Sequence, residues 1–520
     1  MLSAVLPPRM NPMKIHSTIR PAAAVAFAVL GAAPLAAQQL PVPTPPAAMQ
    51  LIKESELKSD LYYLASDAMR GREAGTLDEI RAAAWEAKRA QEAGLLPAGD
   101  DGTYFQWWNM QRTRLSPASE ITVGSHTLVL WKDAAAMATM ATAVDAPTVW
   151  AGDGSDTTID VRGKVAVAQL VKPPANARKF EGVYSPEWHY ATASIGAQGR
   201  ALAERGAAAV ILVADSIGDV AFDAVAANSS RGMYDVDDSA TNAAGGRYGR
   251  RPSGPPVFLA RRALLGALQA SGQPAHIQMI TETFDYPSVN VVAIARGSDP
   301  NLRHEYVLFS SHTDHDGVRF PMDGDSIWNG ADDNASTSVA ILAIGRAFAK
   351  HPGKRSALFV WHGAEERGLL GSRYHAVHPV VPLHDIVAVI NGDLIGRNNP
   401  DTASLLGVQP PHRNSTDLVR MALEANAATG KFVLDSTWDR PTHPEGWYFR
   451  SDHVPYVRHG IPAVMYSTNL HVDYHTPRDE ASRINYAKLK RMTDWMYETG
   501  WLVANAPHRP KVDPGFKLER

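Results

Sequence analysis

Three apolar runs decide the fold: EYVLFSSHTDH (305–315), SALFVWHGAEE (356–366) and DIVAVINGDLIG (385–396). Each has the apolar stretch of a buried strand and ends in polar or charged residues. Helical patterns, such as the one at 335–349, lie between them. Alternating strands and helices indicate an α/β protein with a mixed, mostly parallel central sheet flanked by helices. Such sheets carry their functional sites where strands end and loops begin.

The chain before these runs has two different characters. Residues 51–96 have a helical pattern that breaks at RGREAGT (70–76). Residues 115–285 contain short strand candidates and a Gly-, Ser-, Asn- and Arg-rich stretch at 228–256, which predicts a long exposed loop. These features set residues 115–285 apart from the chain on either side.

The N-terminus predicts export. Basic residues precede an apolar stretch at about 21–35, and the small residues Ala36 and Ala37 follow it. This is the pattern of a secretory signal peptide over 1–37, followed by a Pro-rich lead-in over 38–50. An uncleaved membrane anchor is the alternative, although the stretch is short for one. The expected location is periplasmic or extracellular, with no membrane attachment after cleavage.

The composition narrows the chemistry. Apolar residues make up 45% and charged residues 20% of the 520 residues, as in globular proteins. The formal net charge of −3 gives no support to a nucleic-acid partner. Because there are no cysteines, thiol nucleophiles and thiolate metal sites are excluded. Any metal must be held by His, Asp, Glu and water.

Polar clusters at the predicted strand ends are candidates for such a site. Each has an ordinary alternative explanation: Asp333 could cap the next helix, and a Glu pair or an isolated His could be solvated. However, Asp393 interrupts an apolar strand, and a buried carboxylate is costly unless it is paired or bound to metal. The adjacent Glu365 and Glu366 repel each other, which a multivalent cation would relieve. Histidine with carboxylates suits zinc, with manganese or cobalt as alternatives.

Five motifs, taken in order, resemble the di-zinc aminopeptidase family: SSHTDHDG, NGADDNAS, AEERGLLGS, NGDLIG and YHTPRD. That family includes bacterial leucyl aminopeptidases and, more remotely, glutamate carboxypeptidase and the transferrin receptor. RGKVAVA, ERGAAAVILV and PPVFLA resemble the protease-associated domain inserted in many members. The resemblance implies a zinc exopeptidase fold with a peptidase domain over 51–114 and 286–506, a smaller, β-rich α/β protease-associated domain over 115–285, and a C-terminal tail over 507–520.

The resemblance also implies two zinc ions per subunit. By position, one ion would be held by His312 and Asp393, the other by Glu366 and His475, and Asp333 would bridge them. Two departures from the family pattern stand close by: Thr337 replaces the usual glycine after DDNAS, and Gly392 replaces an apolar residue before Asp393.

Three further residues receive catalytic roles from the resemblance. Glu365 would be the general base, and Asp314 would orient His312 through its other ring nitrogen. Tyr448, three residues before the SDH motif (451–453), would help to hold the oxyanion. The alternative for Tyr448 is a packing aromatic.

The function implied is an exported zinc-dependent exopeptidase acting on peptides, in the first place an aminopeptidase. A carboxypeptidase or dipeptidase of the same fold is the alternative, and it would need a cation such as Arg440, Arg450 or Arg458 for the terminal carboxylate. A non-catalytic, receptor-like protein is a third reading, but such members lose metal ligands that are present here. The sequence leaves the preferred N-terminal residue and the oligomeric state open.

Overall fold

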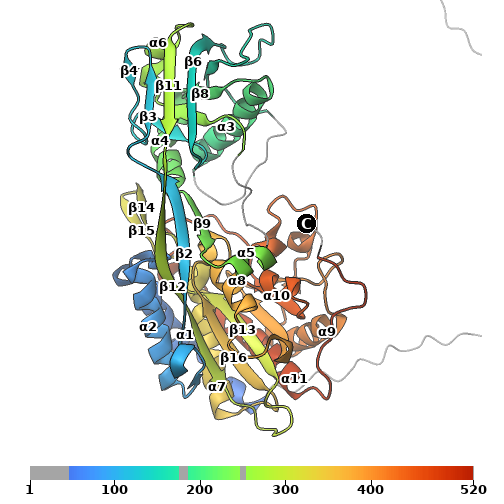
Figure 1. Ribbon diagram of the computed structural model, residues 1–520. Helices are drawn as coiled ribbons and strands as arrows, with labels where there is room; N and C mark the ends of the chain where they lie inside the picture. Colours follow the sequence, from blue (N-terminus) through green and yellow to red (C-terminus); the bar gives the residue numbers. More distant parts are fainter. Residues whose placement is uncertain (1–45, 175–184, 246–252, 519–520) are drawn as a thin grey trace, which may run out of the picture. The chain divides into compact units, whose positions relative to one another are not determined.

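A computed structural model describes residues 46–174, 185–245 and 253–518 (Figure 1). The predicted signal peptide and most of the lead-in lie outside the described residues. Residues Val42–Arg520 form one compact unit. In the described part of the chain, no helix combines the length and apolar character needed to cross a membrane.

The main sheet has ten strands in the order β19-β18-β20-β17-β13-β16-β12-β2-β9, with β1 paired to β12. It is parallel through β20, β17, β13 and β16, and antiparallel where β12, β2 and β9 extend one side and where β18 joins β20. The α/β class is therefore confirmed, with parallel pairing concentrated in the centre. The strands are β1 (Leu96–Pro97), β2 (Phe105–Leu115), β9 (Met233–Val236), β12 (Thr281–Ala295), β13 (Tyr306–His312), β16 (Ser356–His362), β17 (Ile386–Gly392), β18 (Thr402–Leu406), β19 (Val433–Leu434) and β20 (Ala463–Ser467).

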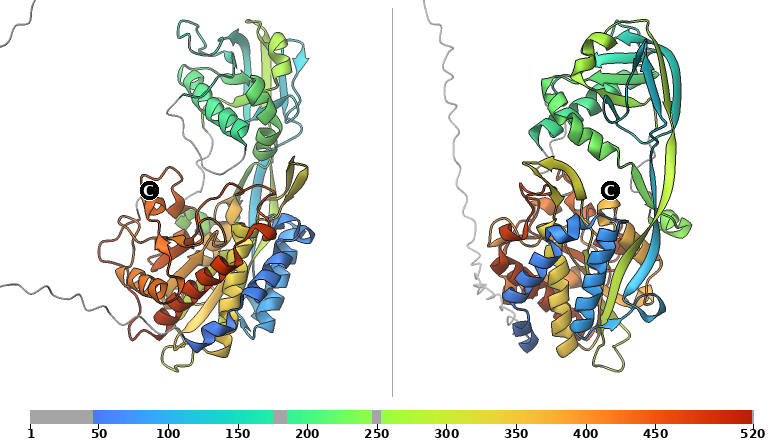
Figure 2. Two further views of the ribbon diagram at one scale, coloured as in Figure 1. Left: turned by 180° about the vertical axis from the view of Figure 1, so that it is seen from behind. Right: turned by 90° about the vertical axis from the view of Figure 1, so that its left-hand side faces the viewer.

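Alternate residues of the central strands feed two separate cores, because successive strand side chains point to opposite faces. Phe309 and Phe359 pack into the core that holds α1, α2, α7, α9 and α11. Leu308 and Leu358 pack into the core of the other face, which contains residues of α8 and α10. Figure 2 shows α7 and α11 on the same side of the sheet as the α1–α2 pair. These helices are α1 (Glu54–Leu64), α2 (Leu77–Glu92), α7 (Ser336–Lys350), α8 (Leu370–Val377), α9 (Thr416–Ala425), α10 (His453–Arg458) and α11 (Tyr486–Asn505).

A second sheet lies within the predicted insertion. Its eight strands run in the order β4-β3-β11-β6-β7-β8-β10-β5, and it has its own apolar cores. The strands are β3 (Glu120–Val123), β4 (His126–Thr127), β5 (Ala134–Ala136), β6 (Thr142–Trp150), β7 (Val165–Gln169), β8 (Ala209–Val213), β10 (Val257–Ala260) and β11 (Pro274–Met279). The helices of the region are α3 (Pro186–Glu204), α4 (Ser216–Ser229), α5 (Ser239–Gly245) and α6 (Leu265–Leu268).

The prediction of a long loop at 228–256 is wrong for the first half of that range. Helix α4 continues to Ser229, β9 follows at Met233–Val236, and α5 begins at Ser239. The sequence did not reveal β9 because its four residues have no apolar alternation. Pairing with β2, where Met110 lies opposite Val236, makes it a strand of the main sheet.

The sheet brings the polar strand ends together. In the parallel pair β13–β16, His312 lies opposite His362, and in β13–β17, Ser310 lies opposite Asn391. The segments that leave these three strands therefore begin at one edge of the sheet. A hairpin of β14 (Gly317–Met322) and β15 (Asp325–Trp328) follows β13 and leads into the ADDN turn before α7.

Candidate metal centre

The first group of potential ligands forms around His312, the last residue of β13. Its side chain is buried, and its Nδ1 lies 3.1 Å from the backbone oxygen of Asp314. Its Nε2 lies 3.3 Å from Asp333 Oδ1 and 3.7 Å from Asp393 Oδ1. His312 Nε2 and Asp393 Oδ1 are buried and have no hydrogen-bond partner among the described residues. Two such atoms facing each other suit a shared cation.

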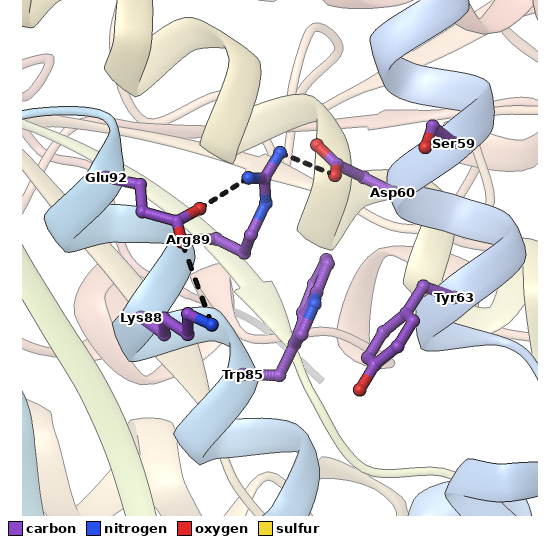
Figure 3. Close-up of a pocket in the computed structure, with 7 residues that line it drawn as sticks. All are labelled: Ser59, Asp60, Tyr63, Trp85, Lys88, Arg89 and Glu92. Carbon is purple, nitrogen blue, oxygen red and sulfur yellow. Dashed lines mark hydrogen bonds and ion pairs between the residues drawn. The ribbon is translucent and has the colours of Figure 1, made fainter.

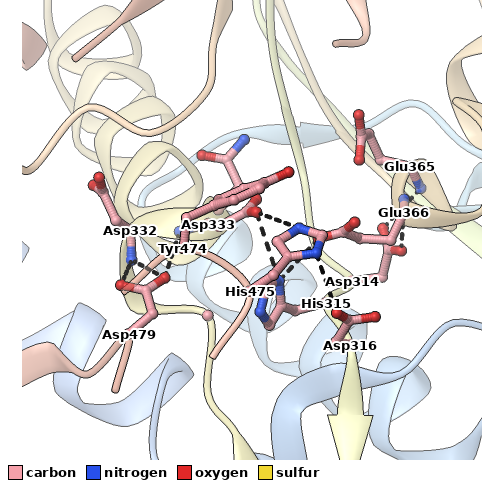
Figure 4. A network of polar contacts seen from close by, with 12 residues as sticks. Asp314, His315, Asp316, Asp332, Asp333, Glu365, Glu366, Tyr474, His475 and Asp479 are labelled. Carbon is pink, nitrogen blue, oxygen red and sulfur yellow. Dashed lines mark hydrogen bonds and ion pairs between the residues drawn. The ribbon is translucent and has the colours of Figure 1, made fainter. Parts of the chain in front are cut away.

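The second group adjoins the first through Asp333. Asp333 Oδ2 lies 3.0 Å from His475 Nε2, which lies 3.1 Å from Glu366 Oε1 (Figure 4). His315 Nδ1 lies 2.9 Å from Glu366 Oε1. Nitrogen and oxygen donors around a zinc ion at 2.0–2.2 Å stand roughly 3.4 Å apart, and these separations are similar. The five residues predicted as ligands thus lie in two groups that share Asp333: one adds His312 and Asp393, and the other adds Glu366 and His475. His315, which was not predicted as a ligand, joins the second group.

The ADDN turn that carries Asp333 is held from two sides. The Asp479 carboxylate accepts hydrogen bonds from the backbone N–H groups of Asp332, at 3.0 and 3.1 Å, and of Asp333, at 3.1 Å. Asn334 Nδ2 donates to the backbone oxygen of Gly392, at 3.0 Å. The turn is therefore tied both to the YHTPRD segment and to the end of β17.

The structure modifies the expected role of Asp314. Its carboxylate lies 3.8 Å from His312 Nδ1, whereas its backbone oxygen takes the ring contact at 3.1 Å. The carboxylate instead accepts hydrogen bonds from the backbone N–H groups of Glu365, at 2.9 Å, and Glu366, at 3.2 Å. Asp314 therefore positions the Glu365–Glu366 turn, and it orients His312 through the main chain.

Glu365 faces the first group. Its Oε2 lies 3.8 Å from His312 Nε2, and its side chain is about one-tenth exposed. Burial holds the pKa of Glu365 well above its usual range; His312 opposes this effect, while Glu366 and Asp393 add to it. A carboxylate with a raised pKa takes up a proton readily, which is the property required of a general base.

Tyr448 does not reach this centre by any contact in the structure. It is fully buried, and its ring stacks on His412 with centroids 4.2 Å apart. It packs in a core with Leu394 and Met465. Its hydroxyl has no hydrogen-bond partner among the described residues. The expected oxyanion role is therefore not supported, because the short helical turn at Trp447–Phe449 directs these rings into the core.

Tyr474 is the aromatic hydroxyl that does lie at the centre. It directly precedes His475 (Figure 4). Its Oη accepts a hydrogen bond from Arg450 Nη2 at 2.9 Å. Burial raises the pKa of Tyr474 well above its usual range; His475 and Arg450 oppose this effect, and the charges of Asp333 and Glu366 add to it. The position of this tyrosine next to a proposed ligand was the signal that sequence reasoning overlooked.

His315 and Asp452 are two further residues that the sequence analysis missed. His315 is fully buried and lies three positions after His312. The second histidine of the HTDH motif was therefore the signal in the sequence. Asp452 is also fully buried, and burial raises its pKa to about 7, with the charges of Asp393 and Asp314 adding to the effect. The centre therefore concentrates more acidic groups than the motifs alone indicated.

A surface pocket of about 340 Å³ lies elsewhere, between α1 and α2 (Figure 3). Tyr63 and Trp85 stack in it with centroids 5.3 Å apart, and Arg89 pairs with Asp60 at 2.8 Å and Glu92 at 2.6 Å. The two aromatic rings of the pocket therefore pack on each other, and its charged side chains pair within it. None of the residues that line this pocket belongs to the metal centre.

Together, the sheet and the strand-end groups define an α/β protein built to hold two neighbouring metal ions. Residues 290–500 match the family model of peptidase family M28, which covers less than half of the chain.

Curated relatives match part of the chain. Leucine aminopeptidase 2 of Trichophyton equinum is 26% identical over 204 residues, which is 38% of this chain and 37% of the relative. Leupeptin-inactivating enzyme 1 of Streptomyces exfoliatus is 29% identical over 281 residues, which is 49% of this chain and 56% of the relative. The chain thus spans little more than a third of the length of the fungal relative.

Solved structures share the fold over most of the chain. The aminopeptidase from Aneurinibacillus sp. strain AM-1 has a TM-score of 0.53 at 18% identity, covering 90% of this chain and 97% of its own. The zinc aminopeptidase BSAP from Bacillus subtilis has a TM-score of 0.54 at 19% identity, covering 90% and 99%. At this level of identity the likeness establishes the fold.

Proposed function

We propose that the protein is a zinc-dependent aminopeptidase that removes residues one at a time from the N-terminus of peptides. The observation that carries this proposal is the position of Glu365, whose carboxylate lies 3.8 Å from His312 Nε2, beside two ligand groups that share Asp333. The M28 match and the aminopeptidase names of the relatives support the same activity.

The donor set fits two zinc ions. His312 and Asp393 would hold one, Glu366 and His475 the other, and Asp333 both, with His315 beside the second. When bound, the two ions would polarise the peptide carbonyl and lower the pKa of the attacking water.

The chain's own residues supply the remaining steps. The Glu365 carboxylate takes a proton from the attacking water and passes it to the amine nitrogen that leaves. Tyr474 accepts a hydrogen bond from Arg450, which leaves its own O–H free to donate to the oxyanion that forms on the carbonyl oxygen. Asp314 keeps Glu365 in place through the backbone N–H of that residue.

The charge of the centre favours an N-terminal substrate. Beyond the metal-facing groups, the buried Asp314 lies beside the centre, 3.8 Å from His312 Nδ1, and negative charge there favours a free ammonium group over a carboxylate. Arg450, one of the cations considered for a carboxypeptidase, is engaged by Glu445 at 2.8 Å and by Tyr474 at 2.9 Å. The carboxypeptidase alternative therefore lacks its cation at this arginine.

Export, peptide partners and the nature of the insertion belong to the same proposal. The basic, apolar and small-residue pattern of residues 1–37 supports a periplasmic or extracellular location. The separate sheet within the insertion, with its own cores, supports a separately folded protease-associated domain. Such a domain would either restrict access to short peptides or act as a spacer.

Metal analysis combined with a substrate panel tests the proposal. We expect two zinc ions per chain, loss of activity with a chelator, and hydrolysis of aminoacyl substrates with a free amine. Cleavage of N-blocked substrates in preference to free-amine ones would reject the aminopeptidase. A purified protein that neither binds zinc nor hydrolyses any peptide would reject the enzyme.

A further inference from the structure

Arg231 reaches the metal centre from outside the segment that matches the peptidase family. It lies between α4 and β9, and its side chain is only 13% exposed. Its Nη1 lies 2.8 Å from Asp316 Oδ1, and its Nη2 lies 3.0 Å from Glu73 Oε1. One guanidinium of the inserted region therefore joins two acidic residues of the main domain.

Asp316 is the carboxylate that orients His475. Its Oδ2 lies 3.2 Å from His475 Nδ1, while His475 Nε2 faces Asp333 and Glu366 (Figure 4). A ligating histidine commonly donates its other ring N–H to a carboxylate, which fixes the tautomer and the orientation of the ring. Asp316 is placed to do this for the second ligand group.

Three arginines hold Asp316 in that position. Arg231 and Arg367 contact Oδ1, at 2.8 and 3.4 Å, and Arg319 contacts Oδ2 at 2.6 Å. Arg319 Nη2 also donates to Asn228 Oδ1, on α4, at 2.8 Å. The buried Asp316 carboxylate is thus fixed by guanidinium groups on both oxygens, and the inserted region supplies contacts to two members of this cluster.

The consequence follows from burial. A carboxylate that is 3% exposed depends on its charged partners, and loss of one partner leaves part of its charge uncompensated. Without Arg231, Oδ1 would keep only the longer Arg367 contact, and the carboxylate would be free to turn toward Arg319. Its hydrogen bond to His475 would then weaken.

We propose that Arg231 is a positioning residue for the metal site formed by Asp333, Glu366 and His475. It acts through Asp316 on the tautomer and orientation of His475, so the inserted region determines how tightly this one site holds its metal. The inference rests on the metal centre of the proposed function, and it makes the region that matches M28 dependent on a residue that precedes it.

Metal competition on the full chain tests this proposal. The affinity of each of the two sites for zinc is measured against a chromophoric chelator for the wild type, Arg231→Met and Arg231→Lys. We expect Arg231→Met to weaken one site about 10–100-fold, the range for loss of a group that orients a ligand, and to leave the other unchanged. Arg231→Lys keeps the positive charge but not the two parallel N–H donors of the guanidinium, so its zinc affinity at this site should lie between those of the wild type and Arg231→Met. Added methylguanidine should restore part of the affinity in Arg231→Met.

Arg261→Met is the matched control. Arg261 lies in the same inserted region, where its guanidinium pairs with Asp223 and stacks on Phe222 at 4.0 Å, and it is not one of the three arginines that contact Asp316. We expect this variant to keep both zinc affinities. Unchanged affinities in Arg231→Lys and Arg231→Met, or equal weakening of both sites, would overturn the proposal. If Arg231→Met does not fold, unchanged affinities in Arg231→Lys overturn it by themselves. A wild type without two zinc sites would instead overturn the proposed function.

Discussion

Arg450 donates a hydrogen bond to the phenol oxygen of Tyr474 at 2.9 Å, and its other terminal nitrogen pairs with the buried Glu445 at 2.8 Å. The tyrosine oxygen is therefore an acceptor toward Arg450 and keeps its own proton for another partner. Burial raises the pKa of Tyr474 well above its usual range, which favours retention of that proton.

Removal of this hydroxyl is the first prediction. Tyr474→Phe should lower kcat about 10–1000-fold with little change in zinc content, as expected for loss of one oxyanion donor. Tyr448→Phe should leave kcat within about twofold, because the structure places Tyr448 against His412 in the core. Steady-state kinetics with an aminoacyl substrate, combined with metal analysis, compare the two. A larger loss from the Tyr448 variant would restore the role implied by the sequence resemblance.

The second prediction separates the two adjacent glutamates. Glu365→Gln should keep both zinc ions and lose kcat about 10²–10⁴-fold, because the amide cannot take up the proton. Glu366→Gln should lose zinc, since Glu366 Oε1 lies 3.1 Å from His475 Nε2 within the second group. Zinc content and single-turnover rates measured on the same preparations distinguish them. Full turnover in Glu365→Gln would remove the general base from the mechanism.

The third prediction concerns the shared ligand. Asp333 approaches His312 with Oδ1 and His475 with Oδ2, at 3.3 and 3.0 Å. Asp333→Ala should therefore weaken both zinc sites, whereas Asp393→Ala should weaken only the site of His312. Titration with zinc followed by isothermal calorimetry measures the two affinities. Two intact sites in Asp333→Ala would show that this carboxylate does not bridge.

A buried acid far from the centre gives a pH-dependent prediction. Glu498 on α11 is 1% exposed, and burial raises its pKa to about 7. An acid with a raised pKa in the folded state stabilises fully below its unfolded pKa, near 4.5, and this contribution is lost as pH rises through 7. Glu498→Gln should therefore gain stability relative to wild type by about 1–3 kcal/mol between pH 5 and pH 8.

Urea unfolding at fixed metal concentration measures this difference. The same substitution at the exposed Glu54 of α1 is the control for loss of a carboxylate at the surface. A constant difference between wild type and Glu498→Gln across this pH range would contradict the prediction.

The ligands could be predicted from sequence because their motifs follow buried strands directly. His312 ends β13 and Asp393 follows β17, so local apolar runs were sufficient to indicate that both lie at one sheet edge. Glu366 and His475 came from the ordered resemblance. The strand β9 and the contacts of Arg231 could not be read in this way, because each depends on a partner far away in the chain. Tyr448 and Tyr474 illustrate the same limit, since only the fold shows which hydroxyl faces the centre.

The two ends of the predicted insertion leave the main sheet as direct neighbours. Leu115 of β2 and Thr281 of β12 are paired residues on adjacent antiparallel strands. A short turn could therefore join these two strands and leave the pairing of β2 with β12 unchanged. A chain shortened in this way would keep the rest of the main sheet but lose its strand β9 together with Arg231, so the region contributes both a strand and a buried cation to the main domain.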